Sequence, residues 1–126
     1  MTALFQDSQP ALQVLKEDRW YNVPPKANHL IINIGDIVQV WSNDRYIAPQ
    51  HRVLANANHE RYSLPYFLNP SYDYAYAPLA TPDGAKPRYR SISWGEFRAA
   101  RSGGDYADQG EEIQISHFRT ANVRGK

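Results

Sequence analysis

Short apolar runs, rich in β-branched and aromatic residues and separated by turn residues, occupy the first two-thirds of the chain. This spacing predicts an all-β barrel or sandwich. Proline cannot donate to a strand ladder, so Pro24-Pro25 ends one of the runs. The expected strands are Thr2–Phe5, Ala11–Leu15, Trp20–Val23, His29–Gly35, His51–Leu54 and Tyr62–Leu68.

Two segments have helical character. "DIVQVWS" follows Gly35 and predicts a short helical turn with Asp36 as its N-cap. "SWGEFRAARSGG" predicts the one clear helix, near 94–101, with Ser93 and Glu96 as a capping box and Gly103 at its end.

The remaining residues predict little regular structure. Residues 71–90 alternate aromatic and polar side chains and then become rich in proline and glycine, which indicates extended chain. A short edge strand is expected at Glu112–Ser116. We therefore expect a β core over residues 1–79 and a C-terminal extension over 80–126.

Composition removes several function classes. The 126 residues carry a formal net charge of +1 with scattered basic residues, so neither a nucleic-acid nor a membrane partner is expected. The chain has no cysteine, which excludes a disulfide, a thiolate metal site and a cysteine nucleophile. No signal-peptide pattern or spanning segment is visible, and we expect a cytoplasmic protein.

His51, Arg61 and Ser63 form the one cluster that suggests binding chemistry. Alternate residues of a strand share a face, so Arg61 and Ser63 point the same way. Antiparallel pairing of their strand with His51–Leu54 would bring His51 close to both. Imidazole is the commonest metal ligand in proteins, and an arginine fork beside a hydroxyl matches a carboxylate. A small dicarboxylic molecule would span a metal and the arginine.

The same residues also allow a structural interpretation. A single histidine in a strand is more often hydrogen-bonded than ligating, and Arg-x-Ser also occurs on solvated edges. The sequence does not fix the strand register on which the cluster depends. His29, His59 and His117 are expected at a strand end, in a loop and in the tail. The spacing alone leaves both interpretations open.

A series of short blocks carries a family resemblance. "LQVL", "W…VPP", "NIGD", "WSN.RY", "HRV", "ERYS" and "FLNP" follow one another between Ala11 and Asp73. In this order they resemble the C-terminal half of the iron(II)/2-oxoglutarate-dependent dioxygenases of the isopenicillin-N-synthase-like superfamily. The block from "RYRSISWGEF" onward resembles the C-terminal extension of some microbial and fungal members. The resemblance implies a mainly β fold, the C-terminal portion of a double-stranded β-helix (a cupin-like jelly roll), with one C-terminal helix.

The resemblance also implies cofactors and roles. The family holds iron with two histidines and one carboxylate, and the histidine of its "HRV" block matches His51. Its Arg-x-Ser clamp for 2-oxoglutarate matches Arg61 and Ser63. The implied cofactors are Fe(II) and 2-oxoglutarate. The implied reaction couples oxidative decarboxylation of 2-oxoglutarate to hydroxylation or desaturation of a small organic molecule, the expected partner.

One motif of the family is missing. Its other two iron ligands form a His-x-Asp motif, which does not occur in this sequence and which the resemblance places just upstream of Met1. We therefore expect a fragment and predict that residues 1–126 alone are inactive and poorly stable. The alternative is a non-catalytic β-barrel binding module or a truncated remnant. Retention of His51, Arg61 and Ser63 together favours the oxygenase, and the sequence does not identify the substrate.

Overall fold

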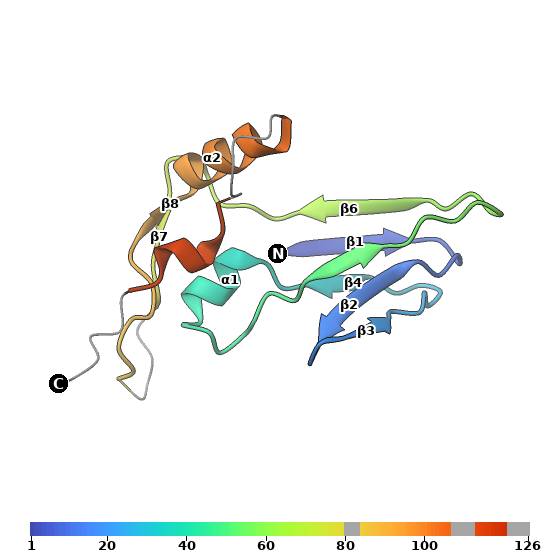
Figure 1. Cartoon of the computed structure of the whole chain (residues 1–126), viewed down its shortest axis with the longest axis horizontal. Helices are drawn as coiled ribbons and strands as arrows, with labels where there is room; N and C mark the ends of the chain where they lie inside the picture. The colour runs from blue at the N-terminus through green and yellow to red at the C-terminus, as the bar shows by residue number, and fades with distance from the viewer. Residues whose placement is uncertain (80–83, 107–112, 121–126) are drawn as a thin grey trace. The chain divides into compact units, whose positions relative to one another are not determined.

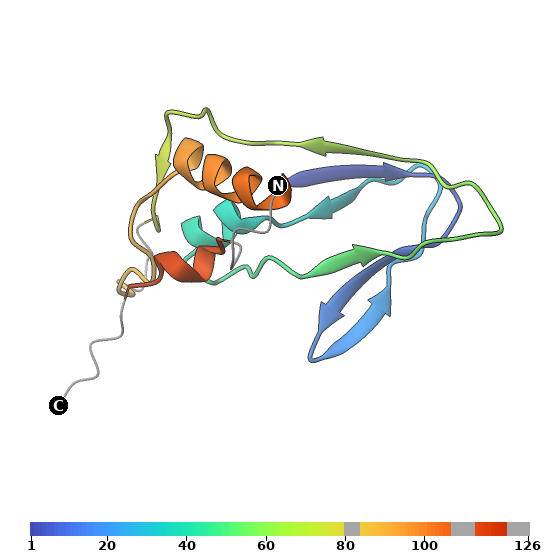
Figure 2. The ribbon, with the colours of Figure 1, turned by 45° about the horizontal axis from the view of Figure 1, so that its top comes forward.

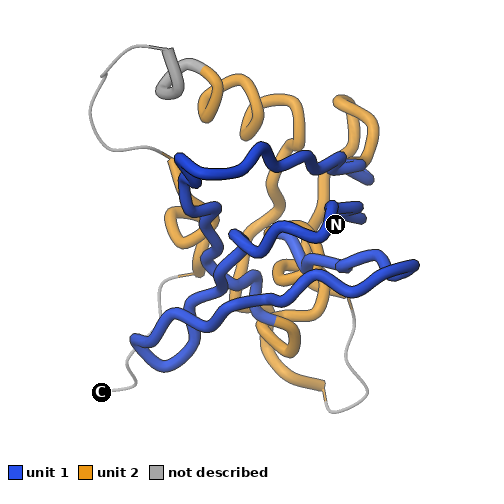
Figure 3. The backbone as a smooth tube through the Cα atoms, turned by 90° about the vertical axis from the view of Figure 1, so that its right-hand side faces the viewer, with its two compact units in different colours: residues 1–35, 47–68 blue, residues 36–46, 69–126 orange. Residues whose placement is uncertain are grey.

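The computed structural model describes residues 1–79, 84–106 and 113–120 (Figure 1). The chain divides into two compact units that alternate along the sequence. Unit 1 comprises residues 1–35 and 47–68, and unit 2 comprises 36–46 and 69–126 (Figure 3). The predicted boundary between residues 79 and 80 is a different kind of division. It separates a family core from a C-terminal extension, and it stays a prediction.

Unit 1 consists of two three-stranded antiparallel sheets, with strand orders β4-β1-β6 and β3-β2-β5. Every predicted strand of this region is present, with ends that differ by one or two residues. The short apolar runs and the turn residues between them were therefore sufficient to locate the strands. Their bounds are β1 Thr2–Gln6, β2 Leu12–Lys16, β3 Arg19–Asn22, β4 Ile31–Asn33, β5 His51–Val53 and β6 Ser63–Phe67.

The hairpin between β2 and β3 follows from its turn residues. Lys16 pairs with Arg19, which leaves Glu17 and Asp18 as a two-residue loop. Both have positive φ, 50° and 58°, as a type I′ turn requires. The twist of such a turn matches that of the flanking strands, and Figure 2 shows β2 and β3 joined by this short turn as a hairpin.

The supposed pairing of the His51 strand with the Arg61 strand is wrong. β5 pairs with β2, where Val14 faces His51, and β6 pairs with β1, where Gln6 faces Ser63. The two strands thus belong to different sheets. Hairpins are usually closed by two to five residues. The longer connection between β5 and β6, residues 54–62, instead crosses from one sheet to the other.

Unit 2 combines short strands with helices. Its elements are α1 Asp36–Trp41, β7 Ala75–Tyr76, β8 Ile92–Ser93, α2 Trp94–Tyr106 and a 3₁₀ helix at Ile115–Phe118. β7 pairs antiparallel with β8. β7 lies in the region 71–90, for which only extended chain was expected, and β8 lies just after it. At the start of α2, Ser93 Oγ accepts a hydrogen bond from the Glu96 N–H at 3.4 Å, as the capping pattern predicted.

Two expectations for the C-terminal region are wrong. Helix α2 continues past Gly103 to Tyr106, because a glycine lowers helix propensity without forcing a helix to end. The predicted edge strand at Glu112–Ser116 is not formed where it is described, since Ile115–Phe118 is a 3₁₀ helix. Glu112 lies outside the described residues.

The core of unit 2 is aromatic. Phe97 stacks on Trp94 with ring centroids 6.0 Å apart and meets Phe118 edge-on at 5.9 Å. Such arrangements match the aromatic quadrupole. The buried cluster contains Ile37, Val40, Tyr76, Tyr89, Ile92, Trp94 and Phe97. Within the described residues, none of the helices has both the length and the apolar character needed to cross a bilayer.

Candidate functional site

A cavity of about 430 Å³ lies in unit 1 and is lined by residues from both of its sheets. Most of its lining is aliphatic or aromatic. One sheet contributes Leu4, Pro65 and Phe67, and the other contributes Leu12, Val14 and Val53. Five polar or charged side chains interrupt this apolar surface: Thr2, Asn33, His51, Arg61 and Ser63. The cavity therefore has the usual form of a small-molecule site, an apolar surface with a few convergent polar groups.

Strand alternation explains why these side chains face inward. His51 pairs with Val14 and Val53 with Leu12, so all four lie on one face of their sheet. On the other sheet Ser63 pairs with Gln6 and Pro65 with Leu4. His51 and Ser63 thus approach the cavity from opposite sheets, although they are only twelve residues apart in the sequence.

His51 is oriented through one ring nitrogen. Its Nδ1 lies 3.2 Å from the Pro49 carbonyl oxygen and 3.5 Å from Asn33 Nδ2. Nδ1 cannot donate to the carbonyl and accept from the amide at once, and the carbonyl contact is shorter. An Nδ1–H that donates to Pro49 leaves the lone pair on Nε2. A backbone acceptor of this kind is the usual support of a metal-binding histidine.

Arg61 is held between two neutral acceptors. Its Nη1 donates to Ser63 Oγ and its Nη2 donates to Gln6 Oε1, each at 3.2 Å. The Arg61 Nε atom is buried and has no hydrogen-bond partner among the described residues. One N–H on Nη1 and one on Nη2 are therefore left for a ligand, and both acceptors already present are uncharged. A planar cation with spare donors beside a hydroxyl fits a carboxylate.

Asp7 fixes the backbone next to this arginine. Its carboxylate accepts from the backbone N–H groups of Tyr62, at 2.5 Å, and Gln9, at 2.9 Å. These two bonds lower the pKa of Asp7, and the charge of Arg61 lowers it further. The Asp7 N–H in turn donates to the Tyr62 carbonyl at 3.1 Å. Asp7 is therefore committed to joining the ends of β1 and β6.

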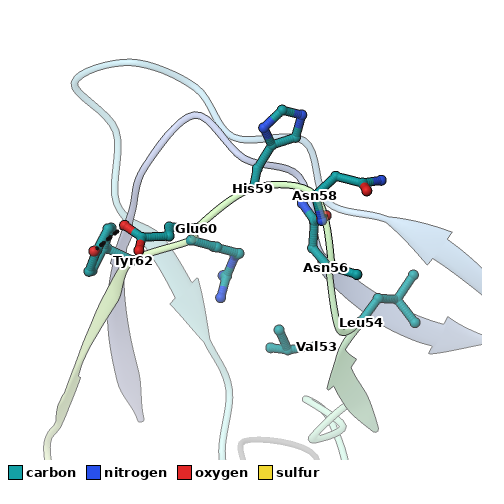
Figure 4. Close-up of a pocket in the computed structure, with 9 residues that line it drawn as sticks. Val53, Leu54, Asn56, Asn58, His59, Glu60 and Tyr62 are labelled. Carbon is teal, nitrogen blue, oxygen red and sulfur yellow. Dashed lines mark hydrogen bonds between the residues drawn. The ribbon is translucent and has the colours of Figure 1, made fainter.

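A second pocket surrounds the loop between β5 and β6, as Figure 4 shows. In this view His59 is turned away from Val53, and Tyr62 donates to Glu60 Oε2 at 2.7 Å. That bond raises the pKa of Tyr62. Tyr62 lines this pocket and not the inter-sheet cavity, as expected for a residue between Arg61 and Ser63. All loop side chains except Arg61 are exposed, so the inter-sheet cavity is the better candidate site.

The residues present fit iron only in part. A facial iron site needs three protein ligands. No group of three or more His, Cys, Asp or Glu side chains able to hold a metal ion occurs among the residues that the structure describes. His51 fits one ligand position through Nε2. A complete iron site therefore needs two more ligands than the described residues bring to His51.

Comparison with known proteins now identifies the family. The sequence profile of the 2OG-Fe(II) oxygenase superfamily matches residues 1–70, more than half of the chain. The chain belongs to this superfamily. Its mostly β structure agrees with that assignment, because the similar solved structures are oxygenases of the same class. The predicted family, jelly-roll fold class and Fe(II)/2-oxoglutarate dependence of the family are confirmed.

The relatives include several plant enzymes. Gibberellin 2-beta-dioxygenase 5 of rice is 42% identical, over 91% of this chain and 34% of its own length. The Arabidopsis gibberellin 2-beta-dioxygenase 8 is 44% identical, over 78% of this chain and 28% of its own length. The chain thus spans about a third of the length of the curated relatives it matches.

Among solved structures, JOX2 in complex with 2OG, Fe and JA has a TM-score of 0.71 at 37% identity. The match covers 78% of this chain and 30% of JOX2. The dioxygenase for auxin oxidation of rice has a TM-score of 0.75 at 25% identity. That match covers 94% of this chain and 41% of the rice enzyme.

The predicted cluster forms, but not through the predicted strand pairing. His51, Arg61 and Ser63 do line one cavity, but they meet across two sheets and not along one ladder. Their roles stay predictions. Gln6 and Asn33, which contact Arg61 and His51, were not considered. Alternation from Thr2 and Leu4 places Gln6 on the inner face, and this signal would have been sufficient to include it.

Proposed function

We propose that this chain binds 2-oxoglutarate in the inter-sheet cavity. Arg61 and Ser63 hold the far carboxylate, and His51 supplies one ligand to iron(II). The observation that carries the proposal is the convergence of these three side chains on one apolar cavity. A degenerate barrel has no need to keep a cation, a hydroxyl and an imidazole facing the same space.

The far carboxylate is matched by charge and by geometry. Arg61 is half-buried, so its charge is screened less than that of a surface arginine. Ser63 Oγ already accepts from Arg61 Nη1, which leaves the hydroxyl hydrogen to be donated to the ligand. Leu4 and Pro65, which also line the cavity, offer apolar surface to the methylene groups between the carboxylates.

Iron contributes the oxygen chemistry of this family when it is bound. From this chain, His51 would coordinate it through Nε2 while Pro49 keeps Nδ1 protonated. One histidine does not enforce a facial geometry, so we expect the chain as given to bind iron weakly and to show no turnover.

The complete protein is proposed to couple 2-oxoglutarate decarboxylation to the oxidation of a small organic molecule. Ile31, Ile47 and Phe67 give the cavity a mainly apolar surface, which favours a substrate with a large hydrocarbon part. The names of the similar proteins, which include gibberellin dioxygenases, are compatible with that class. A second candidate is a non-catalytic binding module, favoured by the incomplete ligand set of the described residues.

The test compares two ligands that differ at one end. 2-Oxopentanoate carries a methyl group where 2-oxoglutarate has its far carboxylate. Dissociation constants for both are measured by NMR titration of the chain and of Arg61→Ala. We expect Arg61→Ala to weaken 2-oxoglutarate binding about tenfold to a hundredfold, the usual range for hydrogen bonds to a charged group, with no effect on 2-oxopentanoate.

Arg52→Ala is the matched control. Arg52 lies on β5 beside His51, but it stacks on Trp20 at 4.0 Å and donates to Gln13, and it does not line the cavity. It should leave both constants unchanged. Equal binding of the two ligands to the unmodified chain would contradict a carboxylate clamp, and so would an equal loss in both arginine variants.

A further inference from the structure

We propose that Gln6 is a positioning residue that aims the Arg61 guanidinium at the far carboxylate. The inference rests on the proposed function, because it concerns the same clamp. It adds a residue to which that function gives no role.

Gln6 is placed for this task by the sheet register. It is the last residue of β1 and pairs directly with Ser63 of β6. Side chains of paired residues stand side by side on one face. The Gln6 amide and the Ser63 hydroxyl are thus neighbours, and Arg61 bonds to both, through Nη2 and Nη1, each at 3.2 Å.

Two contacts at different nitrogens fix the guanidinium plane. An arginine side chain has many rotamers, and a ligand that must order it loses affinity. With Nη1 held by Ser63 and Nη2 held by Gln6, the plane is set before the ligand arrives. One hydrogen on each Nη stays available for a carboxylate.

The neutrality of the Gln6 amide is part of the inference. A carboxylate at position 6 would hold Arg61 equally well but would offset its charge, which the ligand needs. The neighbouring carboxylate of Asp7 is instead hydrogen-bonded to the backbone N–H groups of Tyr62 and Gln9. The guanidinium is therefore held by two uncharged groups.

Gln6 acts through Arg61 and not on the ligand. It does not line the inter-sheet cavity, whereas Arg61 and Ser63 do. Its role is therefore positioning, and the test must read the order of Arg61 as well as the affinity for 2-oxoglutarate.

The experiment uses Gln6→Leu and the matched control Gln13→Leu in the full chain. Gln13 also accepts from an arginine, Arg52 Nε at 2.8 Å, but it lies outside the cavity lining. We expect Gln6→Leu to raise the dissociation constant of 2-oxoglutarate about fivefold to tenfold, which is the range of one ordinary hydrogen bond and less than the loss expected for Arg61→Ala, because Gln6 does not contact the ligand. It should leave the dissociation constant of 2-oxopentanoate unchanged. Gln13→Leu should change neither dissociation constant.

The second measurement is the NMR signal of the Arg61 Nε–H group. Gln6→Leu should broaden it and speed its exchange with water, whereas Gln13→Leu should leave it as in the unmodified chain. Gln6→Glu should keep the Arg61 Nε–H signal sharp and slow to exchange with water. It should still weaken the binding of 2-oxoglutarate, because the added negative charge offsets the charge of Arg61. A purely structural role of Gln6 would not separate these two variants.

The failures can be told apart. Unchanged 2-oxoglutarate affinity in Gln6→Leu, with the loss retained in Arg61→Ala, would overturn the role of Gln6 and leave the proposed function standing. Equal binding by the chain and Arg61→Ala would overturn both. If Gln6→Leu misfolds and binds neither 2-oxoglutarate nor 2-oxopentanoate, the Gln6→Glu variant tests the role of Gln6 instead. An ordered Arg61 signal with weakened 2-oxoglutarate supports the inference, and unchanged affinity refutes it.

Discussion

The two units differ in what they bury. The buried hydrophobic residues of unit 1 are Ala11 and Leu12 alone. The described part of unit 2 buries seven, grouped in one aromatic cluster around Trp94 and Phe97. Unit 1 instead exposes large side chains on the outer face of its β4-β1-β6 sheet: Phe5, Leu64 and Tyr66. The unit that carries the candidate site is the one with little core of its own.

The difference in buried core suggests that the two units contribute differently to ligand binding and to folding stability. An open cavity between two sheets leaves its lining half-exposed, so that lining contributes less to folding than a closed core does. Unit 2 carries none of the residues proposed for binding and can close its core. Substitutions in unit 2 should therefore change stability, while substitutions in the cavity of unit 1 should change binding.

The polar groups show the same contrast. In unit 2 the Asp44 carboxylate, whose side chain is 5% exposed, is saturated. It accepts from Tyr89 at 2.5 Å, Gln39 at 2.9 Å and Arg119 at 2.8 Å. In unit 1, Arg61 is instead held by two uncharged oxygens, Ser63 Oγ and Gln6 Oε1, each at 3.2 Å. Neither acceptor is a carboxylate, so the guanidinium charge is left for an anionic ligand.

The largest expected effect is on the core of unit 2. Phe97 is 2% exposed and contacts two aromatic rings, so Phe97→Ala should lower the free energy of unfolding by about 3 to 5 kcal/mol. Phe5→Ala is the matched control in unit 1. Phe5 is 53% exposed, and its truncation should cost about 1 kcal/mol or less. Urea unfolding followed by circular dichroism gives both values, and equal losses would contradict the comparison.

A smaller effect is expected from the charge of Asp44. Burial raises the pKa of this carboxyl, but hydrogen bonds from Tyr89, Gln39 and Arg119 lower it by more, so it ends below the ordinary 3.8. A lowered folded-state pKa gives stability that is present above the unfolded value and is lost as pH falls through the folded value. Asp44→Asn should therefore destabilise the chain by about 2 kcal/mol at neutral pH, and the difference should shrink below about pH 4.

Asp18→Asn is the control for this titration. Asp18 lies in the exposed turn between β2 and β3, where asparagine tolerates the positive φ equally well. Urea unfolding across pH should give parallel curves for this variant and the unmodified chain. An Asp44→Asn curve that also stays parallel at every pH would show that the charge of Asp44 does not stabilise unit 2.

How far the sequence predicted the structure depends on the range of the contacts. Strands were located from local sequence patterns and from strand-ending residues such as Pro24-Pro25, and both signals act within a few residues. The partners of β5 and β6 depend on contacts with β2 and β1, many residues away, which no local pattern encodes. The length of α2 was underestimated for a different reason, because the two glycines near its end lower helix propensity without ending the helix.

The candidate site was predicted by resemblance more than by geometry. The family blocks selected His51, Arg61 and Ser63, and the cavity brings these three residues together across two sheets. Gln6 lies one residue beyond the expected strand Thr2–Phe5, because its neighbours Asp7 and Ser8 are turn residues. Its bond to Arg61 joins residues 55 positions apart and becomes visible only in the fold.

The central claim is that unit 1 carries the ligand site. It is tested most directly by the amide and imidazole NMR spectrum of the chain during titration with 2-oxoglutarate and Zn(II), a diamagnetic substitute for iron(II). The account predicts that signals of His51, Arg61 and Ser63 shift together while those of the Trp94–Phe97 cluster stay fixed. Shifts confined to unit 2 or to the loop at residues 54–60, or no shifts at all, would contradict it.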